Sequence, residues 1–288
     1  MQTFAYARPP TLDDAFGLLV DGGPGARPMA GGTDLLIRLR DRSLTAGLVI
    51  DVKDIPELGP RIERAGGRLV IGATTTMTAI AADPLVRSRF TALAEAASVV
   101  GSVQIRNRAS LAGNLCNASP AADTAPALLV YGATLVVLGP AGSRRVPVDD
   151  FFVTSGHTTL RPGELLGSIE LPIDDGPLGS AHVRRTRRRG HDLAAVTLAC
   201  SVRTDGTVRL AYGSVGPRPV LAPAGDAIVA DPDADPDLRA AAIDRLFVAA
   251  RPSLTSMRAG PDYRLAMLRV LGRRALDAAA GRSAGAVA

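Results

Sequence analysis

The residues best suited to hold a ligand lie in one stretch, which runs from Ile105 to Pro126 and reads IRNRASLAGNLCNASPAADTAP. It is rich in small residues, contains a single acid, and lies between a helical pattern and an apolar run. Because it offers little bulk for packing, we expect a loop that presents backbone N–H groups and short polar side chains. Small residues let the main chain approach a diphosphate or a flat heterocycle closely. The candidates here are Ser110, Gly113 and Asn114.

A second stretch has the residue types of an anion site. Residues Arg27 to Ala30 are predicted to form a strand, Gly31 to Asp34 a turn, and Leu35 to Arg42 the start of a helix. The tandem glycines permit positive φ and close approach, and Thr33 or Asp34 can cap the helix. Free N–H groups at such a turn favour an anion.

The cysteines and histidines do not indicate a metal centre. Cys116 and Cys200 lie far apart and in no CxxC spacing, so they predict neither an iron–sulfur cluster nor a disulfide framework. The histidines show no metal-ligand spacing. They are His157, His182 and His191. Any redox chemistry is therefore expected to come from an organic cofactor or a partner.

Basic residues are in excess, with a net charge of +5 and a pI near 9.8. A dense run consists of Arg184, Arg185, Arg187, Arg188 and Arg189. Aromatic residues make up only 3% of the chain, so a stacking platform for single-stranded nucleic acid is not predicted. A solvated face, a phosphate clamp or a subunit contact is the interpretation we favour.

The bulk composition is that of a globular protein with two domains. The chain has 288 residues, of which 47% are hydrophobic and 21% charged. No apolar run approaches the length of a membrane span, and the N-terminal residues MQTFAYARPP lack the apolar core of a signal peptide. We therefore expect a cytoplasmic protein without a membrane span.

The elements that must position the two stretches begin with a small parallel sheet. Phe4 to Asp54 is predicted to alternate strand, helix, strand, turn, helix and strand. Arg68 to Gly72 is a predicted strand, followed by a threonine cluster that can cap a short helix. Apolar residues at helical spacing then predict one amphipathic helix from Asp83 to Val100. We expect these apolar residues to pack in the hydrophobic core.

Antiparallel strands are predicted farther along the chain. A hairpin over 134–148 is followed by a strand that Pro172 ends, and the cluster at 174–177 is the candidate domain boundary. Asp205-Gly206 predicts a second hairpin between strands at 193–202 and 208–215. Two helical patterns follow. The C-terminal part is expected to be an antiparallel sheet backed by helices.

Three segments carry a resemblance to a known family: AGGTDLL, IGATTTM and the stretch from Ile105 to Pro126. They look like the FAD-binding medium subunit of the molybdenum hydroxylases, a group that includes aerobic carbon monoxide dehydrogenase and xanthine dehydrogenase. The resemblance implies an α+β chain. Residues 1–175 would form a PCMH-like FAD-binding domain with subdomains of about 1–55 and 56–175, and residues 176–288 a C-terminal flavoprotein domain.

The resemblance also implies which residues hold FAD. The glycine-turn motif that binds the diphosphate falls on Met29, Ala30, Gly31, Gly32, Thr33, Asp34 and Leu35. The family's second motif, Thr-Ile-Gly-Gly-Asn, falls on Ser110, Leu111, Ala112, Gly113 and Asn114. Ala112 replaces a glycine, which is harmless only if its φ is negative.

Further positions follow from the same resemblance. Asp123 matches an acid beside the flavin or its ribityl chain, although a helix cap before Ala127 is an alternative that could hold at the same time. Leu166 and Arg184 match positions that line the cofactor. The crowded arginines leave Arg184 and Arg185 hard to distinguish. Some relatives place an aromatic residue where this chain has Leu193.

The function that the resemblance implies is electron transfer. A molybdenum-binding large subunit would oxidise the substrate, and a two-iron, two-sulfur subunit would pass the electrons to FAD on this chain. The flavin would then reduce a quinone, oxygen or NAD, in an assembly expected to be a dimer of heterotrimers. No catalytic acid, base or nucleophile and no metal are expected on this chain.

Two other classes of function stay open at this point. A self-contained FAD oxidoreductase with the same cofactor fold would need its own substrate pocket and catalytic base, and the scarcity of His and Tyr disfavours it. A basic, non-catalytic module would bind polyanions in a salt-dependent way and would carry no flavin. The substrate of the complex cannot be identified from the sequence.

Overall fold

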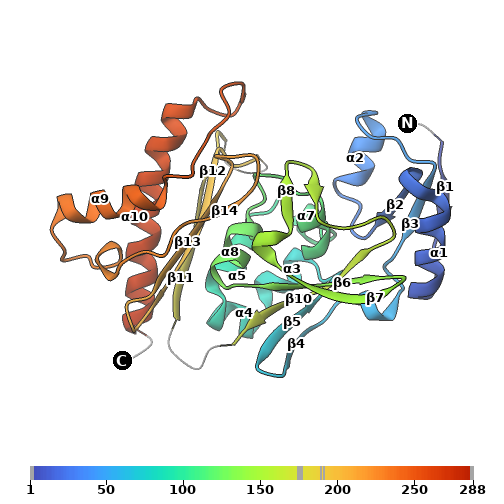
Figure 1. Cartoon of the computed structure of the whole chain (residues 1–288), viewed down its shortest axis with the longest axis horizontal. Helices are drawn as coiled ribbons and strands as arrows, with labels where there is room; N and C mark the ends of the chain where they lie inside the picture. Colours follow the sequence, from blue (N-terminus) through green and yellow to red (C-terminus); the bar gives the residue numbers. More distant parts are fainter. Residues whose placement is uncertain (1–2, 174–177, 189, 191, 286–288) are drawn as a thin grey trace.

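The N-terminal segment forms the predicted parallel sheet. A computed structural model of the chain describes residues 3–173, 178–188, 190 and 192–285 (Figure 1). The sheet has the strand order β1-β3-β2 with parallel pairing throughout. Its elements are β1 (Ala5–Ala7), α1 (Leu12–Gly22), β2 (Ala26–Met29), α2 (Leu35–Arg40) and β3 (Leu48–Asp51). The Thr11 hydroxyl caps α1 by accepting from the Asp14 amide.

The middle of the chain forms an antiparallel sheet with the order β4-β5-β10-β6-β7. Its strands are β4 (Ile62–Ala65), β5 (Arg68–Gly72), β6 (Thr134–Gly139), β7 (Gly142–Pro147) and β10 (Leu165–Pro172). A small hairpin of β8 (Phe152–Thr154) and β9 (His157–Thr158) lies between β7 and β10 in the chain. Since β5 pairs with β10, the central ladder joins segments far apart in the sequence.

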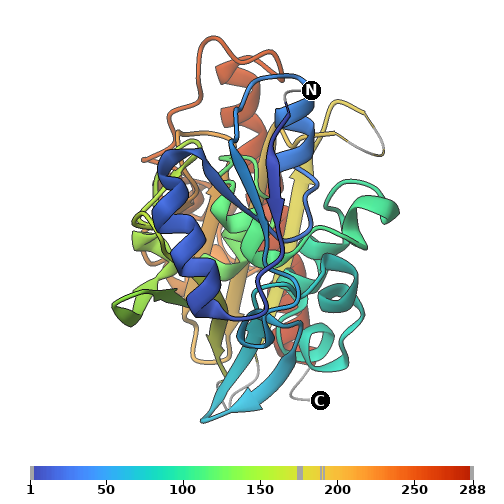
Figure 2. The same cartoon turned by 90° about the vertical axis from the view of Figure 1, so that its right-hand side faces the viewer.

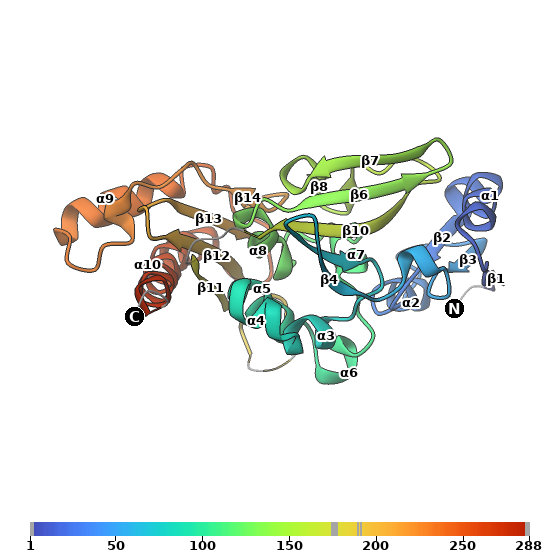
Figure 3. The same cartoon turned by 90° about the horizontal axis from the view of Figure 1, so that it is seen from below.

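A series of short helices joins β5 to β6 and lies along one side of this sheet (Figure 3). They are α3 (Met77–Ala82), α4 (Pro84–Arg89), α5 (Thr91–Ser98), α6 (Val103–Arg106), α7 (Leu111–Cys116) and α8 (Thr124–Val130). The loop expected from Ile105 to Pro126 is therefore wrong. Ser102 and Ser110 cap α6 and α7 by accepting from the amides of Ile105 and Gly113.

The single helix expected from Asp83 to Val100 is also wrong, because it breaks at Phe90 into α4 and α5. The Phe90 ring is buried edge-on against Tyr131, with the ring centroids 5.1 Å apart. The freed amide of Ala92 donates to the hydroxyls of Tyr131 and Ser180 at 3.1 and 3.2 Å. The break is thus stabilised by residues distant in sequence.

The C-terminal part is the predicted antiparallel sheet with helices. Its strand order is β11-β12-β13-β14, and α10 packs on β11 and β12. The elements are β11 (Leu178–Arg185), β12 (Val196–Arg203), β13 (Val208–Gly213), β14 (Val220–Leu221), α9 (Pro236–Leu246) and α10 (Pro261–Gly285). The hairpin at Asp205-Gly206 is confirmed, although β12 begins at Val196 rather than Leu193.

The three sheets follow one another along the molecule. Figure 2 shows them behind one another, with the N-terminal sheet nearest the viewer. The C-terminal sheet is covered on one face by α10 and on the other by α5 and α8. The α+β fold class is confirmed. The boundary expected at 174–177 lies outside the described residues, so the domain limits stay a prediction. In the part of the chain that is described, no helix is both long and apolar enough to cross a membrane.

The two faces of the C-terminal sheet differ in composition. The face toward α10 carries large apolar residues such as Leu198, Leu210 and Tyr212 in one core cluster. The opposite face carries Ala199 and Ala211, which join the core of the middle sheet. Because side chains alternate along a strand, His182 and Arg184 share this second face with Ala199. The second face therefore brings polar groups to helices α5 and α8.

Candidate functional site

The glycine turn packs directly against the backbone that precedes the second motif. A β-carbon built on Gly31 would overlap the carbonyl group of Arg108 and lie 3.1 Å from the Ala109 Cα. Gly32 has a φ of +72°, which favours glycine. The position before α2 is Asp34, and no side chain caps this helix, so the expected cap by Thr33 or Asp34 is wrong. Backbone shape, rather than capping, defines the turn.

The turn leaves a row of amide groups available. Among the residues that the structure describes, the N–H groups of residues 31 to 34 have no hydrogen-bond acceptor. The Leu36 amide, by contrast, donates to the Gly32 carbonyl at 3.0 Å as the helix begins. Unpaired amides in a turn are the groups that bind phosphate oxygens. The turn can therefore take an anionic group.

The second motif is a capped helix start held by the threonine segment after β5. The Ser110 hydroxyl accepts from the Gly113 amide at 3.2 Å. The Leu111 amide donates to the Thr75 carbonyl at 3.1 Å, and the Met77 amide donates to the Ala109 carbonyl at 2.9 Å. Ala112 lies within α7 and is not among the residues of positive φ, so its extra methyl group causes no backbone strain.

Asn114 is oriented by a buried threonine. The Thr124 hydroxyl donates to Asn114 Oδ1 at 2.7 Å, and Thr124 is fully buried. With its oxygen taken, the Asn114 amide is left with its NH2 group to donate. Gly113 beside it is exposed, which leaves the backbone open to a ligand. The hydrogen bond also connects α7 to the start of α8.

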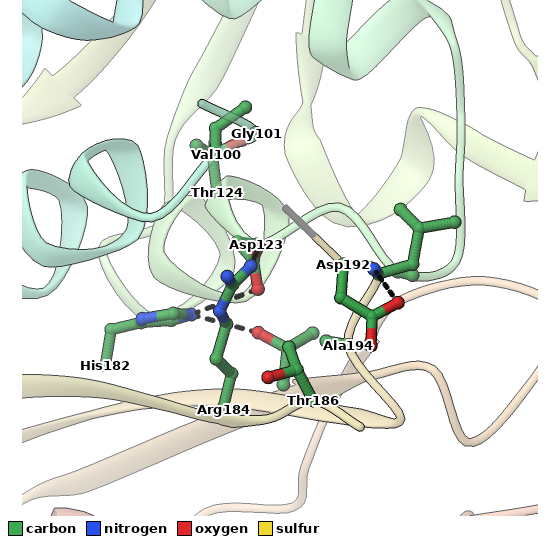
Figure 4. A network of polar contacts seen from close by, with 12 residues as sticks. Val100, Gly101, Asp123, Thr124, His182, Arg184, Thr186, Asp192 and Ala194 are labelled. Carbon is green, nitrogen blue, oxygen red and sulfur yellow. Dashed lines mark hydrogen bonds and ion pairs between the residues drawn. The ribbon is translucent and has the colours of Figure 1, made fainter. Parts of the chain in front are cut away.

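Asp123, at the start of α8, pairs with an arginine of the C-terminal sheet (Figure 4). Arg184 Nη1 donates to Asp123 Oδ2 at 2.7 Å, and the two side chains are 16% and 7% exposed. The Asp123 side chain makes no capping hydrogen bond to α8, so the cap alternative is wrong. The two arginines are also distinguished, since Arg185 Nε donates instead to the Tyr263 hydroxyl at 2.9 Å.

The second oxygen of this carboxylate provides a test of whether the site fits a cofactor. Asp123 Oδ1 is buried and has no hydrogen-bond partner. His182 Nε2 lies 3.7 Å from this oxygen. A buried carboxylate oxygen without a donor is costly, whereas a ligand hydroxyl would satisfy it. Together with the free amides of the turn and the NH2 group of Asn114, this oxygen fits a ligand with a phosphate end and a polyhydroxyl chain, as FAD has.

Two other predicted positions are less closely connected to these groups. Leu166 is buried in the core on β10, the strand against which α7 packs. Leu193 is half exposed. Within the basic run, the backbone amides of Arg187 and Arg188 donate to Asp192 Oδ2, whereas Arg189 lies outside the described residues. Burial alone would raise the pKa of Asp192, but the Arg188 amide and the Arg187 guanidinium outweigh it and lower that pKa.

The described residues contain no group of three or more His, Cys, Asp or Glu side chains that could hold a metal ion. A pocket of about 260 Å³ opens at the opposite end of α8 from Asp123, and Phe90, Tyr131 and Ser201 are among its lining residues. It includes no residue of the glycine turn or of α7. The candidate site is therefore located by the two motifs and Asp123, not by this pocket.

Sequence reasoning missed Thr124 and His182. Thr124 follows Asp123 directly, but its partner Asn114 is ten positions earlier, and only the close packing of α7 and α8 brings them together. His182 lies two residues before Arg184, so strand periodicity places both on one face. The alternation of side chains along this strand was the feature of the sequence from which a role for His182 could have been predicted.

The chain matches two family models along its length. Residues 2–174 match the FAD binding domain in molybdopterin dehydrogenase, and residues 181–279 match the CO dehydrogenase flavoprotein C-terminal domain. The xanthine dehydrogenase FAD-binding subunit of Escherichia coli O157:H7 is 30% identical, with 98% of this chain and 97% of that protein covered. The carbon monoxide dehydrogenase medium chain of Hydrogenophaga pseudoflava is 31% identical, with 98% of each covered.

Solved structures agree with these sequence matches. A chain of carbon monoxide dehydrogenase from Hydrogenophaga pseudoflava superimposes with a TM-score of 0.89 at 31% identity, covering 98% of both chains. A chain of quinoline 2-oxidoreductase from Pseudomonas putida 86 gives a TM-score of 0.88 at 27% identity, again covering 98% of both. The similarity thus extends over the whole fold.

Proposed function

The chain belongs to the family of FAD-binding flavoprotein subunits of the molybdopterin dehydrogenases, and from this premise we propose that it is the electron-transfer subunit of such a complex. When bound, FAD supplies the redox chemistry, accepting electrons and handing them on. The residues of this chain bind and orient it. The observation that carries the proposal is the contact of the glycine turn, at Gly31, with the backbone directly before the second motif, taken together with the unpartnered oxygen of Asp123.

We assign the residues by their free hydrogen-bonding groups. The unpaired amides of Gly31 to Asp34 would hold the diphosphate, with Met29, Ala30 and Leu35 forming the ends of the turn. Residues 110–114 would present the backbone of α7 and the NH2 group of Asn114. Asp123 Oδ1 would accept a hydroxyl of the ribityl chain while Arg184 holds Oδ2, and Leu166 would support α7 from beneath.

The partners are proposed on the strength of the relatives' names. Relatives of nearly equal identity are named for carbon monoxide, xanthine and quinoline, so the flavin subunit does not by itself define the substrate. We propose that a molybdenum-binding large subunit oxidises the substrate and that a two-iron, two-sulfur subunit delivers the electrons. The assembly would be a dimer of heterotrimers in the cytoplasm, reducing a quinone, oxygen or NAD.

The test is an absorbance spectrum of the purified chain before and after incubation with FAD and desalting. We expect retained flavin bands with a protein-perturbed shape, at a stoichiometry of one FAD per chain. If neither the chain alone nor the chain co-expressed with its neighbouring subunits retains flavin, the proposal is wrong. Reduction of the bound flavin by a small organic substrate without any partner chain would favour the stand-alone oxidoreductase instead.

A further inference from the structure

A buried histidine faces the carboxylate of the proposed flavin site. The His182 side chain is only 2% exposed. Its Nε2 atom lies 2.9 Å from the Thr197 hydroxyl. The same atom lies 3.7 Å from Asp123 Oδ1, the buried oxygen that has no partner (Figure 4). His182 Nε2 is therefore within hydrogen-bond distance of the neutral Thr197 hydroxyl. The Asp123 carboxylate lies just beyond that distance.

The other charged groups around His182 are engaged elsewhere. Arg184, on the same strand, donates a hydrogen bond to the other carboxylate oxygen of Asp123, Oδ2. Glu95 of α5 accepts from the His182 backbone amide at 2.8 Å, not from the ring. Arg282 of α10 is paired with Glu95 at 2.6 Å. The unpartnered Asp123 oxygen is thus an acceptor within reach of a charged imidazole.

We propose that His182 is a positioning residue that makes FAD binding depend on pH, an inference that rests on the proposed function. When neutral, the imidazole shares the Thr197 hydroxyl and leaves Asp123 Oδ1 open for a ligand hydroxyl. When protonated, it has an N–H donor on each ring nitrogen, and attraction closes the gap to Asp123. The imidazolium then occupies the oxygen that the ligand needs.

The direction of the effect follows from this competition. Histidine is the side chain that changes charge between about pH 5 and pH 8. FAD should therefore bind less tightly as the pH falls through that range. Because coupling between two binding events is reciprocal, bound FAD must weaken proton binding at His182 by the same factor. Binding of FAD should accordingly release protons.

The experiment compares the wild-type chain with His182→Gln, whose amide is neutral at every pH used. We expect the FAD dissociation constant of the wild type to rise at least about fivefold between about pH 8 and about pH 6. In His182→Gln it should stay near the wild-type value at the higher pH. His157→Gln, which replaces an exposed histidine, should behave like the wild type. Calorimetry in buffers of different ionisation enthalpy should detect proton release in the wild type and in His157→Gln only.

The possible results distinguish a failure of the role proposed for His182 from a failure of the proposed function. An equal pH dependence in the wild type and in His182→Gln, or tighter binding of FAD at low pH, would overturn the role of His182 while leaving the proposed function intact. Wild type that retains no FAD at either pH, alone or in the assembled complex, would overturn both. If His182→Gln does not fold, Thr197→Val provides the second variant. It removes the competing hydroxyl and should steepen the pH dependence, and an unchanged profile would count against the proposal.

Discussion

The two halves of the candidate site are built in different ways. The glycine turn is defined by its backbone, because Gly31 lies against the Arg108 carbonyl and no side chain caps the helix that follows. The part of the site around Asp123 is defined by side chains, since Arg184 and His182 of β11 reach the Asp123 carboxylate at the start of α8. The first half should therefore be sensitive to added volume. The second half should be sensitive to a loss of charge or of a hydrogen bond.

The largest effect is expected from volume at the turn. Gly31→Ala adds a methyl group that overlaps the Arg108 backbone, which cannot yield as a flexible side chain would. We expect a loss of stability of about 3 kcal/mol and no retention of FAD after desalting. The matched control is Gly47→Ala, because a β-carbon there meets no atom within 4 Å. Both variants are measured by urea unfolding and by flavin absorbance, and equal behaviour would refute the importance of the close contact.

A smaller but still large effect is expected from removing the Asp123 carboxylate. Asp123→Ala leaves the guanidinium of Arg184 mostly buried without its partner, and the loss of stability should be about 2 kcal/mol because that side chain can still reach some water. FAD affinity should fall about 100-fold, equivalent to about 2.7 kcal/mol. The double variant Asp123→Ala with Arg184→Ala separates the two contributions in a thermodynamic cycle. Normal FAD retention in the single variant would remove Asp123 from the site.

The smallest effect is expected from the hydrogen bond that orients Asn114. Thr124→Val keeps the side-chain shape but removes the donor to Asn114 Oδ1. Stability should fall by about 1 kcal/mol, and FAD affinity by about tenfold, because the Asn114 amide can then rotate. Thr78→Val is the control, since it removes an exposed hydrogen bond to Asn107 of 2.6 Å. If both variants retain FAD equally, Asn114 does not depend on Thr124.

Local patterns were sufficient for much of the fold. The strand and helix alternation before Asp54 and the hairpin at Asp205-Gly206 depend on residues close in sequence, and both were predicted. The break at Phe90 was not, because the contacts that stabilise it come from Tyr131 and Ser180, which are distant in sequence. The loop expected from Ile105 to Pro126 failed for another reason. Helix α8 is buried on all sides, so it has no polar face and no amphipathic period.

The candidate site shows the same contrast between contiguous sequence patterns, which could be predicted, and contacts between distant residues, which could not. The glycine turn and residues 110–114 are contiguous motifs, which a resemblance can place directly. The pairing of Asp123 with Arg184 joins the start of helix α8 to strand β11, 61 positions later in the chain, and its geometry required the structure. His182 lies outside any motif and was not predicted, because its partners Asp123 and Thr197 are both distant in sequence. Their roles toward FAD stay proposals.

The pairing of β5 with β10 has a consequence for the order of folding. Gly72, at the end of β5, lies opposite Ser168, and the next amide, that of Ala73, donates to the Gly167 carbonyl. The threonine segment that follows is the one that holds Leu111. Contacts between such distant segments close slowly, because a long loop must lose its freedom before they form. We therefore expect the backbone contacts that hold residues 110–114 to form late in folding. Binding of the cofactor should then be one of the last steps in the maturation of this chain.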